Sequence, residues 1–563
     1  MRVLCSIVLA VFSLTLLAQE KAIPPTSRLA PPSDSVAAKP TNTKAQPDKP
    51  EIELPEVLIL GTNRSRQINA EKEHRTPAAP VLFHSDAEAG VITSWFEQER
   101  NKPAFIPGTH HVNEHGWASV SAGNYLTLTG NAGYWRRVED FSLNVRARSL
   151  YTGGQYKNST ATHAEMSGIF HLDSTPRWNT KIQTRLANRK FGLYSLLNGD
   201  ATRSINQADI FGSTEYKIPA AGRVTLVADL TALTLETDTS ESSLEKSRGN
   251  NFTLQGTYQD NFGPIPVTIS GNIFREKLKP RENGNSRIQD AGSIGFSVKL
   301  PVNMVWHADI GLDYQTYASD SMKTTHQFAP RASLIYAPNN NVGLAMQVFS
   351  GYGYTAYSSR FDDNHFLTHT PEYSPNDARF GAQFTLEMQL LATLSMQTRF
   401  RYTNMQQVQY WSSNGNGLFR LQTLQDVEST DIRFIVEYTP VDKVHIQLVS
   451  SAYRANYQDS ALKHSEAIPY KPQVTFESEI NVDLRDNLSV RAGTDYTGRR
   501  YLNPDNSGWL TGVWNVSTGL DYKVTKRYQL QGTINNLLNR EYDRWEGIPG
   551  TGIQVLFGGR ATF

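Results

Sequence analysis

From residue 117 to its end, the chain repeats one pattern, in which short segments alternate apolar and polar side chains. The last segment shows the pattern clearly, because Ile553, Val555 and Phe557 are apolar whereas Gln554 is polar. A period of two is typical of a β-strand that has one apolar and one polar face. Similar segments lie at 382–390, 394–402, 432–438, 474–484, 488–496 and 514–522. The chain is therefore predicted to be all-β.

The composition argues against several functional classes. The 563 residues carry 55 lysines and arginines against 54 aspartates and glutamates, so no basic footprint for nucleic acid appears and no nucleic-acid partner is expected. Cys5 is the only cysteine, which leaves no residues for disulfides, zinc fingers or thiol catalysis in the rest of the chain. No Ser/His/Asp or paired-carboxylate spacing suggests catalysis. We expect neither an enzyme nor a bound cofactor.

Residues 1–18 have the parts of a secretion signal. Arg2 supplies a basic start, residues 3–17 an apolar run, and Ala18 the end of an imperfect small-residue cleavage site. Cys5 lies near the beginning of the apolar run, whereas a lipoprotein would have its cysteine at the end. No later stretch approaches the roughly 20 apolar residues of a spanning helix, so any membrane crossing after secretion must use strands.

A closed antiparallel barrel in the outer membrane of a Gram-negative cell accounts for the alternation. Its apolar faces would meet outer-membrane lipid, and barrel-assembly machinery would be a partner during biogenesis. Tight connections are predicted at 337–341, 390–392, 439–442, 484–487 and 524–527, and long ones at 354–377, 411–417, 455–472, 500–507 and 541–551. Such barrels have short periplasmic turns and longer extracellular loops. The segments predict about 22 strands, the size of a wide transporter barrel.

The faces of individual residues follow from the same pattern. Trp514 and Tyr522 are predicted to face lipid, and Phe563 is predicted to lie at the periplasmic rim. The polar residues between the apolar positions would line a wet lumen: Gln383, Thr385, Glu387, Gln397, Arg399, Arg401, Glu477, Glu479, Asp483, Arg491 and Asp495.

The last forty residues carry a more specific motif. It consists of an Asn-Leu-Leu-Asn-x-x-Tyr stretch, a Gly/Pro loop and a final alternating strand, and its residues are Asn536, Leu537, Leu538, Asn539, Tyr542, Phe557 and Phe563. This end of the chain resembles the C-terminus of TonB-dependent outer-membrane receptors. The resemblance covers 117–563 as architecture. It implies transport of a small ligand of the siderophore or cobalamin class, with TonB as a partner.

Residues 19–64 are predicted to form a Pro-rich periplasmic linker, because such a composition cannot bury enough apolar surface to fold. The linker contains a β-prone run, Glu56, Val57, Leu58 and Ile59, which resembles a TonB box. A run of this kind binds by adding a strand to the edge of a partner's sheet. An ordinary strand at a domain edge explains the run equally well.

Residues 65–116 depart from the family, which places a much longer plug domain before the barrel. A plug that is reduced or absent is therefore expected, with a short helix at 85–100. His110, His111 and His115 form a cluster, but their spacing is not the helical zinc pattern, so no metal site is predicted. Two functions remain open: a transporter with reduced gating, and a plugless passive channel or an anchor for a periplasmic or surface partner.

Overall fold

The computed structural model describes residues 116–563, apart from gaps at 139–140, 176, 195–200, 220–221, 240–241, 281–284, 304, 340, 370–371, 416 and 458–466. The predicted signal, the linker with Glu56–Ile59, and the histidine cluster lie outside the described residues. Within the described part, no helix has the length and apolar character needed to span a membrane.

One sheet of 22 strands makes up the described barrel. Its strands are β1 (Gly116–Gly123), β2 (Thr127–Val138), β3 (Phe141–Thr152), β4 (Ala161–Thr175), β5 (Trp178–Gly192), β6 (Thr202–Lys217), β7 (Arg223–Thr239), β8 (Ser242–Phe262), β9 (Ile265–Lys279), β10 (Arg287–Pro301), β11 (Trp306–Ser319), β12 (Met322–Asn339), β13 (Val342–Gly353), β14 (Asn376–Leu391), β15 (Leu394–Ser413), β16 (Phe419–Val441), β17 (Val444–Tyr457), β18 (Val474–Arg485), β19 (Leu488–Thr497), β22 (Val513–Lys523), β23 (Tyr528–Asn535) and β26 (Gln554–Thr562).

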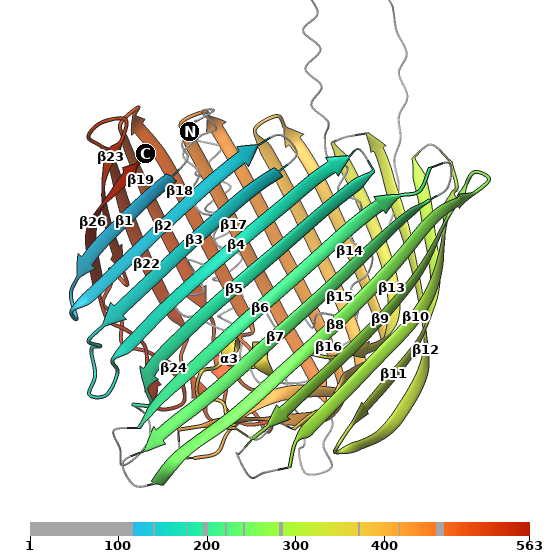
Figure 1. Cartoon of the computed structure of the whole chain (residues 1–563), viewed down its shortest axis with the longest axis horizontal. Coiled ribbons are helices and arrows are strands. Elements are labelled where there is room, and N and C mark those ends of the chain that lie inside the picture. Colours follow the sequence, from blue (N-terminus) through green and yellow to red (C-terminus); the bar gives the residue numbers. More distant parts are fainter. Residues whose placement is uncertain are drawn as a thin grey trace, which may run out of the picture. The chain divides into compact units, whose positions relative to one another are not determined.

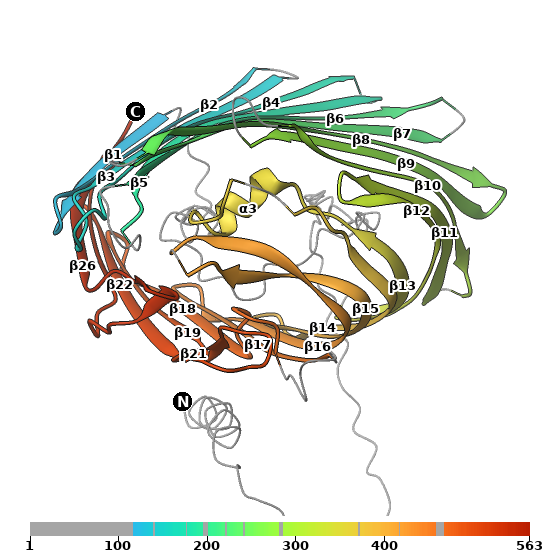
Figure 2. The same cartoon turned by 90° about the horizontal axis from the view of Figure 1, so that it is seen from below.

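The sheet closes on itself. Each strand pairs antiparallel with its neighbours, and β26 returns to β1 in a register that runs from Trp117 opposite Thr562 to Gly123 opposite Leu556. At the end of the seam, the amides of Gly116 and Phe563 each donate to the other residue's carbonyl at 2.9 Å. Figure 2 shows the resulting ring. The prediction of a closed antiparallel barrel of about 22 strands is confirmed.

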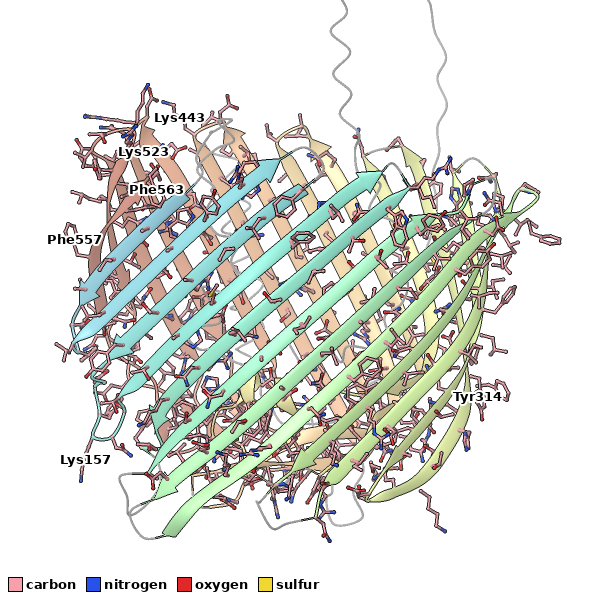
Figure 3. The ribbon with its side chains drawn as sticks, viewed as in Figure 1. Lys157, Tyr314, Lys443, Lys523, Phe557 and Phe563 are labelled. Atoms are coloured by element: carbon pink, nitrogen blue, oxygen red, sulfur yellow. The ribbon has the colours of Figure 1, made fainter. Side chains whose placement is uncertain are left out.

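Side chains alternate between the two faces of the wall, as β22 illustrates. Trp514 and Tyr522 are 38% and 40% exposed on the outer face, where the sequence predicted them. Asp521, between them in the alternation, is buried and lies 3.4 Å from the Arg491 guanidinium. Figure 3 shows Phe557 and Tyr314 projecting from the outer surface. A polar lumen inside an apolar wall follows.

Connections alternate in length around the barrel. Short turns lie at the end where β1 begins and β26 ends, which marks the periplasmic side, and the long connections lie at the opposite end (Figure 1). Several tight turns are stabilised by a side chain that accepts hydrogen bonds from nearby amides. Asn339 Oδ1 accepts from Asn341 and Val342, at 2.8 and 3.0 Å, which is the reason that Asn favours such turns.

Three small elements lie in the long connections. They are α3 (Tyr357–Asp363), the β20–β21 pair (Arg500–Tyr501 and Trp509–Leu510) and the β24–β25 pair (Asp543–Trp545 and Ile548–Pro549). Figure 2 shows α3 inside the ring of strands rather than on its outside. These elements form the outer mouth of the barrel.

Candidate functional site

The connection between β13 and β14, residues 354–375, folds into the barrel and carries α3. The helix starts without help from its own sequence, because its N-cap residue Ala356 makes no side-chain hydrogen bond. Instead, the Glu276 carboxylate of β9 accepts from the amides of Tyr357 and Ser358, at 2.8 and 3.3 Å. A carboxylate at this place satisfies two free amides and suits the positive end of the helix. The wall of the barrel therefore caps α3.

A buried arginine anchors the second half of this connection. Arg203 of β6 is fully buried, and its Nη1 donates to the carbonyl oxygens of His365 and Leu367 at 2.8 and 2.6 Å. Its Nε donates to Thr237 Oγ1 at 3.0 Å, which fixes the guanidinium on β7. Hydrogen bonds that involve a charged donor are about twice as strong as neutral ones. Arg203 therefore attaches the connection firmly to the wall.

The connection also contacts β16 at Phe419, its first residue. Leu367 pairs with Phe419 in an isolated parallel bridge. The Thr368 amide donates to the Phe419 carbonyl at 2.7 Å, and the Phe419 amide donates to the Phe366 carbonyl at 2.9 Å. Since Arg203 and Glu276 lie on β6 and β9, the connection is held between the wall on that side and the outer end of the β15–β16 hairpin, which folds into the ring (Figure 2).

An apolar core packs in the outer mouth around this contact. It joins side chains from the β5–β9 wall, from the β13–β14 connection and from the mouth segments on the other side, and its members are Leu193, Ala201, Ile205, Leu233, Leu235, Leu278, Tyr357, Phe361, Phe366, Leu367, Tyr373, Trp411, Phe419, Leu421, Tyr470, Leu510, Trp545 and Ile548. The Trp545 ring lies 5.0 Å from Phe419 and 5.1 Å from Tyr470 between centroids. Burying each large side chain stabilises the closed arrangement by roughly 1.5–3 kcal/mol.

Beneath this core lies a polar cavity of about 1900 Å³, bounded by strands β3–β15 and by the inner face of α3. Ser358, Ser359 and Asp362 of the helix line it, together with Gln383 and Arg401, two of the residues that the sequence predicted to face the lumen. Because most of the residues that line the cavity are polar or charged and the apolar core packs at the outer mouth, the site consists of a wet chamber beneath a packed core.

Charged side chains attach α3 to the part of the cavity wall formed by β4–β6. The Asp362 carboxylate lies 2.5 Å from Arg189 Nη1 and 3.9 Å from Arg185 Nη1, both on β5. Arg185 also contacts Glu165 of β4 at 3.1 Å and Asp209 of β6 at 3.4 Å. The chamber wall and the helix are thus joined by an ionic network.

The predicted C-terminal signature lies elsewhere in the barrel. Asn536 and Asn539 adopt positive φ angles of 47° and 46°, which asparagine tolerates better than most residues. The Asn536 amide group donates to the carbonyls of Arg540 and Thr551, both at 3.0 Å, and so shapes the start of the β23–β26 connection. Tyr542 accepts, through its carbonyl, from the Gly550 amide at 2.7 Å.

The apolar members of the signature face outward. Leu537, Leu538, Phe557 and Phe563 are exposed, and the last two are visible on the outer surface in Figure 3. The signature residues form a loop support and a lipid-facing surface, and none of them lines the cavity. Sequence reasoning did not single out Arg203, Glu276 or Asp362, because no local motif surrounds them.

Comparisons with known proteins agree with this fold. No protein-family model matches the chain. The catecholate siderophore receptor Fiu of Escherichia coli K12 is 25% identical over 211 residues, and the Fiu of strain UTI89 is 24% identical over 209 residues; each match covers 36% of this chain. The match spans 25% of the length of these curated relatives.

Solved structures match over a larger share of the chain. The closed form of the ferric-catecholate import receptor Fiu from E. coli K12 superposes with a TM-score of 0.61 and 12% identity, over 80% of this chain and 82% of Fiu. The siderophore receptor PiuA from Acinetobacter baumannii and the copper transporter OprC give TM-scores of 0.61 with 10% identity; these matches also cover 80% of this chain, with 82% of PiuA and 80% of OprC.

These similar proteins are receptors or transporters by name, which supports the prediction that the chain is not an enzyme. The outer membrane of a Gram-negative cell is the location that the fold and the relatives indicate. The barrel of this chain has the fold of TonB-dependent outer-membrane receptors, as its C-terminal motif predicted.

Proposed function

We propose that this protein is an outer-membrane transporter that admits a small ligand through movement of its own outer connections. The observation that supports this most strongly is the packing of residues 354–375 and the outer end of the β15–β16 hairpin into an apolar core above a chamber lined mainly by polar residues. A passive pore has no need for such a closure. The first ligand class to test is the ferric catecholates, for which the relative Fiu is named, followed by cobalamin.

Opening requires that the connection leaves the anchors on the barrel wall. Arg203 and Glu276 must release backbone groups of the connection, and the apolar core must separate. A ligand shifts such an equilibrium only by the difference between its affinities for the open and closed states. The ligand therefore has to bind wall groups that the connection occupies in the closed state. The chamber wall carries such groups.

Energy coupling is a separate part of the proposal. The run Glu56–Ile59 would pair with TonB by strand addition and supply the force that releases ligand into the periplasm. Val57→Pro removes a backbone donor from the run and disfavours the extended pairing. We expect this variant to abolish uptake while leaving ligand binding to whole cells unchanged.

The test is uptake of iron-55 as a ferric catecholate by cells that lack their own catecholate receptors and express this protein. Accumulation that requires both the protein and a functional TonB supports energised transport. A large, steady conductance of the purified protein in planar bilayers, combined with no effect of Val57→Pro in cells, would overturn it. The passive channel or anchor would then stand.

A further inference from the structure

The part of the chamber wall formed by β3–β6 is rich in cationic side chains. Strands β3 and β5 place Arg146, Arg148, Lys181 and Arg185 along the cavity, whereas β4 and β6 contribute the carboxylates of Glu165 and Asp209. Both carboxylates lie against Arg185, at 3.1 and 3.4 Å. Among the described residues, Arg146 and Arg148 make no ion pair. This wall therefore has spare positive charge that faces water.

The strand register brings these cations together. Arg148 is opposite Glu165, and Glu165 is opposite Ala187 of β5. Ala187 stands between Arg185 and Arg189 on the same face of β5, because side chains of a strand alternate. Neighbouring strands are about 4.8 Å apart, so the backbone of Arg148 lies about 10 Å across the sheet from the backbone of β5. The spacing suits a small ligand that has more than one anionic group.

The pair of arginines on β5 already holds a carboxylate, which comes from α3 rather than from the wall. Asp362 of α3 contacts both guanidinium groups, at 2.5 Å to Arg189 and 3.9 Å to Arg185. The Nη2 of Arg185 is buried and makes no hydrogen bond. Arg185 itself is fixed by Glu165 and Asp209 on the neighbouring strands, so its position does not depend on α3.

We propose that Arg185 and Arg189 form a binding site for an oxyanion group of the ligand, and that Asp362 occupies this site as an internal competitor when the mouth is closed. This inference rests on the proposed function and names the substrate class, a small polyanion. The single carboxylate of Asp362 cannot bind both the spare Nη2 donor of Arg185 and the guanidinium of Arg148. A ligand with several oxyanion groups can bind both. Guanidinium groups suit this exchange because they bind oxyanions through two donors in a fixed geometry.

Exchange at this site would also favour opening of the mouth by removing one of the contacts that hold it closed. Asp362 belongs to α3, so its displacement removes the ionic contact that holds the helix against β5. The tether gives Asp362 a high effective concentration, on the order of millimolar or above, which sets the affinity that a ligand has to exceed. Monoanions would compete poorly, and polyanions would compete well.

The experiment uses purified full-length protein in detergent, with pyrophosphate as the polyanionic probe and inorganic phosphate as the smaller one, at constant ionic strength. Asp362→Asn removes the competitor and should tighten pyrophosphate binding by about tenfold or more in calorimetry, since its local concentration no longer opposes the ligand. Asp363→Asn is the matched control. It removes the same charge from the same helix, where Asp363 lies 3.8 Å from Arg360 of that helix.

Adding Arg189→Gln to Asp362→Asn should cancel the gain, and heat-modifiable migration in gels reports that each variant barrel is folded. Three results would each overturn the proposed anion site. They are an equal increase in pyrophosphate affinity in Asp363→Asn, no increase in Asp362→Asn, and an increase that persists when Arg189→Gln is added. Because binding is measured without transport, failed iron uptake with an intact pyrophosphate effect would overturn the transport function alone.

Discussion

At the scale of single residues, Arg203 is the side chain on which the anchoring of the 354–375 connection depends most directly. It is fully buried and donates to two carbonyls of the 354–375 connection, and no other described side chain holds both. Arg203→Met keeps much of the side-chain volume but removes both charged hydrogen bonds. The loss should weaken closure by about 3 kcal/mol or more. Proteolysis within 354–375 on intact cells should become faster, while heat-modifiable migration stays normal.

Arg203→Lys is the informative companion variant. Lysine keeps the charge, but its single ammonium group cannot reproduce the fixed fork that contacts both carbonyls. We expect an intermediate cleavage rate. Wild-type protease resistance in Arg203→Met would contradict the anchoring role.

His365 predicts how closure depends on pH. Burial, together with the nearby Arg189 guanidinium, lowers the pKa of the His365 imidazole to about 4 from an ordinary value of 6.5, although Asp362 and the Phe361 carbonyl act in the opposite direction. The open connection therefore binds a proton more readily than the closed one. Closure is at full strength above about pH 6.5 and weakens as the pH falls towards 4, by at most about 2 kcal/mol at pH 5.

Tryptophan fluorescence can follow this change, because Trp411 and Trp545 lie in the apolar core of the mouth. Acidification from pH 7 to 5 should shift their emission towards that of exposed tryptophan. His365→Gln should flatten the pH dependence, with Arg203→Met as an open reference. An unchanged pH profile in His365→Gln would show that another group titrates.

At the scale of elements, the strands were predictable from sequence and α3 was not. A period of two is a local property, so the strands of the barrel, their faces and the alternation of connections could be read from neighbouring residues. The helix is seven residues long and its cap comes from Glu276, 81 positions before Tyr357. Arg203 likewise acts 162 positions from His365. A single sequence has no local signal for such contacts, and residues 354–377 were predicted to be an ordinary outer loop.

The packing of β16 against the connection gives an element-scale prediction. Phe419 is fully buried, pairs with Leu367 and contacts the rings of Tyr470 and Trp545. Phe419→Ala removes these contacts and leaves a cavity, at a cost of about 3–5 kcal/mol in the closed state. Planar bilayers should record more frequent openings. The outward-facing Phe380→Ala is the control, and equal effects of both variants would refute a specific role of the mouth core.

At the scale of the whole molecule, the terminal aromatic predicts an effect on assembly. Phe563 is 71% exposed on the outer side of the seam, where its backbone pairs with Gly116. Phe563→Asp puts a charge on the lipid-facing surface, which such barrels tolerate poorly. The amount of heat-modifiable barrel in outer membranes should fall. Unchanged yield would show that the C-terminal motif has little weight in assembly.

The central claim is that transport requires α3 to leave its place in the chamber, and a reversible lock tests it most directly. The Asn251 Nδ2 of β8 donates to Ser358 Oγ of α3 at 2.8 Å, so these two side chains meet, and a cysteine at each position is the pair to test for a disulfide between the helix and the wall. In cells that express Asn251→Cys/Ser358→Cys, we expect uptake of iron-55 as ferric catecholate to stop on oxidation and to return on reduction, with both single-cysteine variants unaffected. Equal uptake by the oxidised and reduced double variant, with the disulfide verified by mass spectrometry, would contradict the gate.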